Sequence, residues 1–131
     1  MNHENMKLID LKKLRPHEEI DPVALQMLSG KIIRDGYWMT PVIIDKDTGI
    51  IMDGHHRYNF AVQFGLSIIP CYELSYSSGT IQVYDWKSGA IFPEKKIIEH
   101  VNAGKAFPPK TTRHVFDIIF DPVKVELTSL Y

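Results

Sequence analysis

The chain has 131 residues, a length that suits one globular domain able to bury a core without disulfides or metal ions. Hydrophobic residues make up 44% of it and charged residues 24%, which are ordinary values for a soluble globular protein. The net charge of −1 lacks the basic excess that is typical of proteins bound to nucleic acid, so we expect no nucleic-acid partner.

The first residues are polar and no apolar run approaches the length of a membrane span, so we expect a cytoplasmic protein without a membrane partner.

The N-terminal half begins with a short strand and a helix. A strand and a loop are predicted over residues 7–14. A helix follows, because Asp21 suits the N-cap, Pro22 suits the first helical position, and Gly36 provides a stop.

The next predicted element is a hairpin that runs directly into a second helix. Its strands cover residues 41–45 and 50–52. The second strand passes through Asp53 and Gly54 into a helix predicted over residues 55–64. This strand–glycine–helix turn is the most informative local feature of the sequence.

The C-terminal half mixes strands with one further helix. Strands are predicted over residues 67–72 and 81–84, a helix over 93–102, and two extended pieces over 112–119 and 123–127. The pattern predicts a single compact domain over residues 1–131, of the α/β (α+β) class, with a small mixed sheet. Its expected core consists of Leu25, Leu28, Ile32, Val42, Ile44, Ile51, Ala61, Val62 and Ile69.

A phosphate site is predicted where the hairpin enters the second helix. The first N–H groups of a helix have no intrahelical partner and, with the helix dipole, attract anions. His55, His56 and Arg57 lie in this first turn, and Gly54 permits a close ligand approach. Asp53 precedes them, as either an N-cap or a magnesium contact through water. The alternative is an ordinary capped helix with surface histidines.

Two other clusters carry chemistry-bearing side chains. Glu18 and Glu19 precede the first helix, where a carboxylate could orient an alcohol and accept its proton. Residues 110–114 combine hydroxyls, cations and a histidine that could hold a carboxylate or phosphate, or form only a basic surface loop. Trp86 is predicted to be core or pocket wall. With one cysteine and no zinc-like histidine spacing, we expect no structural metal site.

The order of elements and the run Asp53-Gly54-His55-His56-Arg57-Tyr58 resemble the ParB/sulfiredoxin superfamily, and more closely its free serine kinase branch. The similarity covers about residues 8–75, and the segment 110–114 extends it. Members of this branch are typically longer. The resemblance implies an Mg²⁺-assisted transfer of phosphate from ATP or ADP to the hydroxyl of free L-serine.

The resemblance also implies roles for individual residues. Glu18, in a His-Glu pair ahead of the first helix, matches the catalytic base. The residues expected around the nucleotide phosphates and base are Asp53, Gly54, His55, His56, Arg57 and Trp86, with Asp53 and His56 also counted as catalytic. The residues expected to bind the substrate are Thr112, Arg113 and His114.

Relatives with other functions fit less well. A sulfiredoxin needs a cysteine where this chain has His55. Chromosome-partition ParB proteins carry a Gly-Glu-Arg-Arg motif, bind CTP and continue into a helix-turn-helix domain, whereas this chain has Gly54-His55-His56-Arg57. A non-catalytic nucleotide-binding or ligand-sensing regulatory module remains the alternative to a kinase.

Overall fold

A four-stranded mixed sheet organises the fold, in the computed structural model that describes residues 6–131. The N-terminal residues 1–5, whose polarity contributes to the expectation of a cytoplasmic protein, lie outside this range. The strand order is β1-β5-β3-β4, in which β3 and β5 are parallel and the other pairs antiparallel. The strands are β1 (Met6–Asp10), β3 (Val42–Asp45), β4 (Ile51–Asp53) and β5 (Ile68–Leu74).

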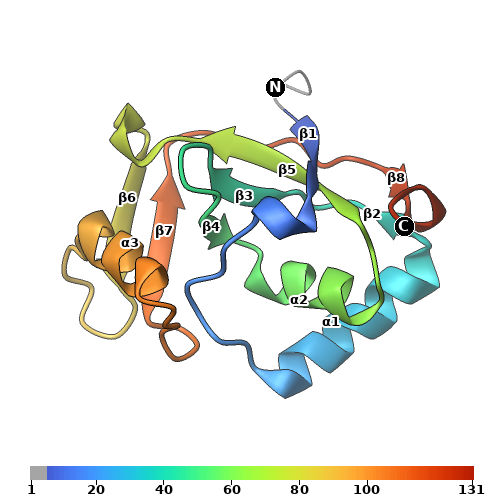
Figure 1. The fold of residues 1–131 in the computed structure, drawn as a ribbon, viewed down its shortest axis with the longest axis horizontal. Coiled ribbons are helices and arrows are strands. Elements are labelled where there is room, and N and C mark those ends of the chain that lie inside the picture. Colours follow the sequence, from blue (N-terminus) through green and yellow to red (C-terminus); the bar gives the residue numbers. More distant parts are fainter. Residues whose placement is uncertain (1–5) are drawn as a thin grey trace.

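Two helices, α1 (Pro22–Asp35) and α2 (His55–Gln63), pack together along one face of this sheet (Figure 1). The predicted caps of α1 are confirmed: the Asp21 carboxylate accepts the Val23 N–H at 3.0 Å, and Gly36 ends the helix in the left-handed conformation at φ 74°. The main core lies between the helices and the sheet.

A second group of elements gathers at one end of the sheet (Figure 1). The antiparallel strands β6 (Ile81–Asp85) and β7 (Thr112–Phe116) lie beside α3 (Glu94–Asn102), and a second apolar cluster joins this group to the main sheet. At the other end, β2 (Tyr37–Trp38) pairs with β8 (Val125–Glu126). Short 3-10 helices cover Leu11–Lys13, Tyr76–Ser78 and Leu127–Ser129.

Most of the predicted elements are confirmed, with shorter C-terminal strands than expected. In the predicted core, Ile32, Val42, Ile44, Ile51, Ala61 and Ile69 are buried, whereas Leu25 and Leu28 are only partly buried against it. The prediction for Val62 is wrong, because that side chain is 53% exposed. The helix α2 turns Phe60 and Ala61 toward the sheet, and Val62 follows them onto the outer face.

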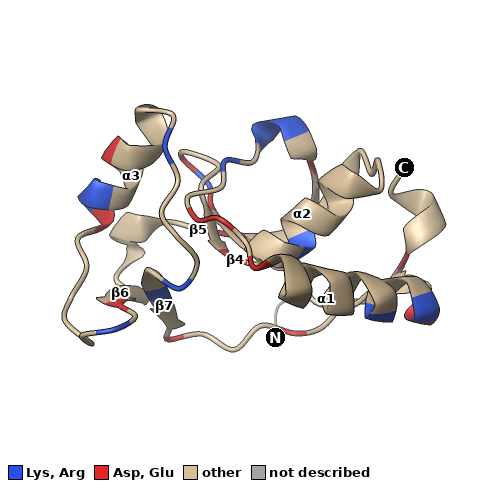
Figure 2. Cartoon of the chain, turned by 90° about the horizontal axis from the view of Figure 1, so that it is seen from below, with Lys and Arg blue, Asp and Glu red and all other residues tan. Residues whose placement is uncertain are grey.

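Charged residues of both signs are interspersed on the helices. Figure 2 shows basic and acidic segments together on α1 and α3. Ion pairs one helical turn apart join Lys31 to Asp35 at 2.9 Å and Lys95 to Glu99 at 3.9 Å. None of the helices formed by residues 6–131 combines the length and the apolar character needed to cross a lipid bilayer.

Candidate active site

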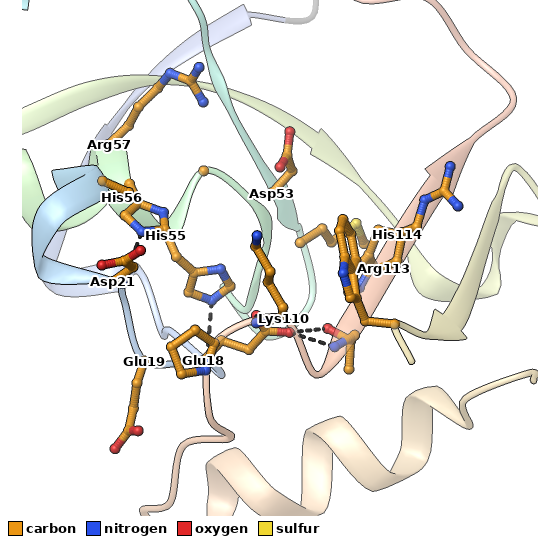
Figure 3. A pocket seen from close by; sticks show the side chains of 16 residues that line it. Glu18, Glu19, Asp21, Asp53, His55, His56, Arg57, Lys110, Arg113 and His114 are labelled. Carbon is orange, nitrogen blue, oxygen red and sulfur yellow. Dashed lines mark hydrogen bonds between the residues drawn. The ribbon is translucent and has the colours of Figure 1, made fainter. Parts of the chain in front are cut away.

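A pocket of about 340 Å³ opens where the loop before α1, the start of α2 and the strand β7 meet. Segments that are far apart in the sequence form its wall (Figure 3). The ten residues singled out from the sequence all line it: Glu18, Asp53, Gly54, His55, His56, Arg57, Trp86, Thr112, Arg113 and His114. The structure therefore brings the three predicted clusters together in one cavity.

The turn into α2 depends on Gly54. Its φ of 108° is rare for residues with a side chain, and a Cβ there would lie 3.0 Å from Cγ2 of Val42. Gly54 is itself the N-cap, which rules out the N-cap alternative for Asp53, and no side chain among residues 6–131 caps the helix. The first intrahelical bond is donated by Tyr58 N–H to the Gly54 carbonyl, so the N–H groups of residues 55–57 precede the helical ladder at the pocket wall.

The two histidines of this turn hold the loop that carries Glu18. His55 Nε2 accepts the backbone N–H of His17 at 3.1 Å and of Glu18 at 3.3 Å. His56 Nε2 accepts the Asp21 N–H at 3.1 Å. We call these contacts the histidine latch, since they join the start of α2 to residues 17–21.

The histidine latch determines where positive charge lies in this turn. Burial, together with the nearby His17 ring, lowers the pKa of His55 to about 3, so this imidazole is neutral. The Nε2 atom of His56 also acts as an acceptor in the latch and therefore carries no hydrogen there. Positive charge in this turn therefore resides on Arg57. Its pKa is lowered by burial, while the charge of Asp53 opposes that shift.

Glu18 is held by the segment that leads into β7. Its Oε2 accepts the Thr112 N–H at 2.8 Å and the Thr112 hydroxyl at 2.5 Å, and its Oε1 accepts the Lys110 N–H at 3.2 Å. Burial raises the pKa of Glu18, but hydrogen bonds from His17 and Thr112 outweigh it and lower the pKa to about 2. Glu19 is exposed and points away from this cluster (Figure 3). Of the two glutamates, Glu18 is therefore the one whose carboxylate is held in this cluster.

Lys110 and His17 are site residues whose roles the sequence did not reveal. Lys110 adopts a left-handed backbone at φ 57°, the one positive φ of a non-glycine residue among residues 6–131. This conformation aims its N–H at Glu18, while its side chain extends into the pocket (Figure 3). Strained backbone of this kind is concentrated at functional sites. His17 is completely buried behind Glu18, and only the His-Glu pair marked it in the sequence.

Three neighbouring side chains of β7 have different surroundings in the pocket: Thr112, Arg113 and His114. The Thr112 hydroxyl lies 2.8 Å from His17 Nε2 and donates to Glu18. His114 Nε2 lies 3.0 Å from the Tyr76 hydroxyl, and burial lowers the pKa of His114 to about 3. The Arg113 guanidinium lies 5.9 Å from the centre of the Trp86 ring, in cation–π contact.

Trp86 belongs to the pocket wall and not to the core. Its side chain is 47% exposed beside the cavity. An exposed aromatic face at a pocket edge offers a stacking surface for a planar ring. Within residues 6–131, no group of three or more His, Cys, Asp and Glu side chains is placed to hold a metal ion. A magnesium ion that is bound mainly through nucleotide phosphates needs only one or two carboxylates, and Asp53 at the pocket wall fits that need.

This chain is similar in sequence to curated proteins of two kinds. A ParB-like protein of Sulfolobus acidocaldarius is 33% identical over 97 residues, which cover 74% of this chain and 48% of that protein. An ATP-dependent L-serine kinase of Staphylothermus marinus is 31% identical over 105 residues, which cover 77% of this chain and 42% of the kinase. The chain therefore matches less than half the length of each relative. No protein-family model matches it.

A solved structure shares the whole fold. It is a glutamate-to-alanine variant of a free serine kinase in complex with ADP. The two structures superpose with a TM-score of 0.89 at 18% sequence identity, over 97% of this chain and 94% of the other. The predicted α+β fold with a small mixed sheet is confirmed by this likeness.

Proposed function

We propose that this chain, which belongs to the ParB/sulfiredoxin-like superfamily, is a small-molecule kinase that transfers a phosphate from ATP or ADP to the hydroxyl of free L-serine, giving O-phospho-L-serine. We further propose that residues 1–131 form a single nucleotide-binding domain and act in the cytoplasm. The relative named as an ATP-dependent L-serine kinase, and the fold shared with a free serine kinase bound to ADP, support the reaction class.

The observation that carries the proposal is the position of Glu18. Its carboxylate lies in the same pocket as the start of α2, where the N–H groups of residues 55–57 form an anion site. A carboxylate base beside a phosphate site is the arrangement that phosphoryl transfer to an alcohol requires. The histidine latch fixes the distance between the loop that carries Glu18 and the start of α2.

In the proposed reaction Glu18 orients the serine hydroxyl and accepts its proton. The serine oxygen forms a new bond to the terminal phosphorus, and the bond from that phosphorus to the leaving nucleotide oxygen breaks. Mg²⁺, when bound with the nucleotide, would neutralise phosphate charge, and Asp53 is the carboxylate suited to contact it. Arg57 and the N–H groups of α2 would hold the phosphates, and Trp86 would stack on the adenine. Arg113 and His114 are the proposed substrate contacts.

The alternative is a regulatory module that binds a nucleotide or another ligand without catalysis. The similarity to a ParB-like protein favours it specifically. The pocket residues would then bind phosphates, while Glu18 would serve to hold β7.

The experiment that decides between the two is an incubation of the protein with Mg²⁺, a panel of free amino acids and either ATP or ADP, followed by phosphorus NMR. We expect a phosphoserine signal with L-serine and with one or both nucleotides, and none without protein. Nucleotide binding without any phosphorylated amino acid would favour the regulatory module. Binding of CTP alone would indicate a function like that of the partition proteins.

A further inference from the structure

A buried chain of hydrogen bonds lies behind Glu18 and ends at His17. His17 Nδ1 lies 2.8 Å from the carbonyl oxygen of Ile51, which can only accept, so this nitrogen carries a hydrogen. His17 Nε2 lies 2.8 Å from Thr112 Oγ1, which in turn lies 2.5 Å from Glu18 Oε2. The imidazole, the hydroxyl and the carboxylate therefore form one continuous path.

This path needs one more proton than neutral His17 and ionised Glu18 can supply. The Thr112 hydroxyl has a single hydrogen, yet it lies between two groups that would both have to accept it. The path is complete only when a further proton lies on His17 Nε2 or on Glu18 Oε2. Glu18 also accepts the backbone N–H groups of Lys110 and Thr112, and such bonds favour the ionised carboxylate. The proton therefore belongs on His17.

The neighbouring histidines are not placed to take this proton. The His55 ring centre lies 4.6 Å and the His114 ring centre 5.5 Å from that of His17. His55 Nε2 accepts two backbone N–H groups, and His114 Nε2 faces the hydroxyl of Tyr76, whose pKa is raised by burial. Protonation of His55 Nε2 would break both of its bonds, and burial lowers the pKa of His114 to about 3. His17 Nε2 faces the Thr112 hydroxyl oxygen, which can accept the hydrogen of a protonated ring.

We propose that His17 is a positively charged positioning residue that holds Glu18 ionised and correctly oriented through the Thr112 hydroxyl. The role in catalysis rests on the proposed kinase function, but the charge on His17 does not. His17 keeps its Nε2 proton throughout the reaction, since Glu18 itself accepts the serine proton. When the pH rises and His17 loses that proton, the Thr112 hydroxyl is left between two acceptors, and activity falls.

The charge is tested directly by nitrogen NMR of the full chain labelled with ¹⁵N-histidine, recorded from neutral to alkaline pH. We expect one imidazole, identified by its shift in Thr112→Val, to have both nitrogens protonated at neutral pH. His55 and His114 should each keep one unprotonated nitrogen. An unprotonated His17 Nε2 at neutral pH would overturn the proposal.

The positioning role is tested by the pH profiles of kcat for Thr112→Val and Thr112→Ser. Loss of the hydroxyl in Thr112→Val should lower kcat by about 10- to 100-fold, as expected for a charge-assisted hydrogen bond, with a smaller change in KM for serine. It should also shift the pH at which kcat falls on the alkaline side of the profile. Thr112→Ser retains the hydroxyl and should keep the wild-type profile.

The two proposals fail in different ways. Equal losses of kcat in Thr112→Ser and Thr112→Val would overturn the positioning role of His17. The same would follow if kcat fell at the wild-type alkaline pH in both variants. A charged His17 in a wild-type protein that makes no phosphoserine would overturn the kinase function and leave the pairing of His17 with Glu18 intact.

Discussion

At the residue scale, variants of His56 distinguish a structural role of its imidazole from direct phosphate binding. Its Nε2 accepts the Asp21 N–H and so fixes the loop that carries Glu18. We expect His56→Ala to lower kcat about ten- to a hundredfold, because a small displacement of a catalytic group costs that much, and to change nucleotide affinity far less. Steady-state kinetics with nucleotide calorimetry would measure both quantities.

The matched control for His56 is His56→Gln, since its amide oxygen can accept the same N–H bond. This variant should recover most of the turnover that His56→Ala loses. Parallel losses of affinity and turnover in both variants would instead show that the imidazole contacts the phosphate, as the sequence had suggested.

At the element scale, the turn from β4 into α2 requires glycine for two reasons. Gly54→Ala combines strain at φ 108° with a 3.0 Å approach of its Cβ to Val42. We expect a stability loss of about 1–3 kcal/mol and a weaker affinity for nucleotide, because the displaced turn carries the N–H groups of residues 55–57. Thermal unfolding and calorimetry would measure these two effects.

Gly65→Ala provides the control at the other end of α2. Its φ of 75° is also positive, but a Cβ there meets nothing within 4 Å. This variant should lose less stability than Gly54→Ala and leave nucleotide affinity unchanged. Equal nucleotide affinity in Gly54→Ala, Gly65→Ala and the wild type would contradict the assignment of the anion site to the turn from β4 into α2.

At the scale of the whole molecule, the sequence predicted the elements better than the contacts between them. Caps and turns are local, so Asp21, Gly36 and Gly54 were sufficient to place α1 and the start of α2. The outward position of Val62 was not predictable, because helical spacing alone does not say which face meets the sheet.

The candidate site was predicted as a set of residues but not as a set of roles. Glu18 and Thr112 are 94 positions apart, and only the resemblance to a family placed their segments together. The partners of His55 are backbone N–H groups in a distant loop, which no side-chain pattern reveals. The neutral state of His55 follows from burial, and burial is a property of the assembled fold.

The central claim is that Glu18 is the base of a phosphoryl transfer, and comparison of Glu18→Gln with Glu19→Gln tests it most directly. Turnover to phosphoserine and nucleotide affinity would be measured for both variants and for the wild type. Loss of a general base lowers the rate by about a hundred- to ten-thousand-fold. We expect that loss in Glu18→Gln, with nucleotide affinity within a small factor of wild type, and near-normal turnover in Glu19→Gln. Near-normal phosphoserine formation by Glu18→Gln would contradict the account.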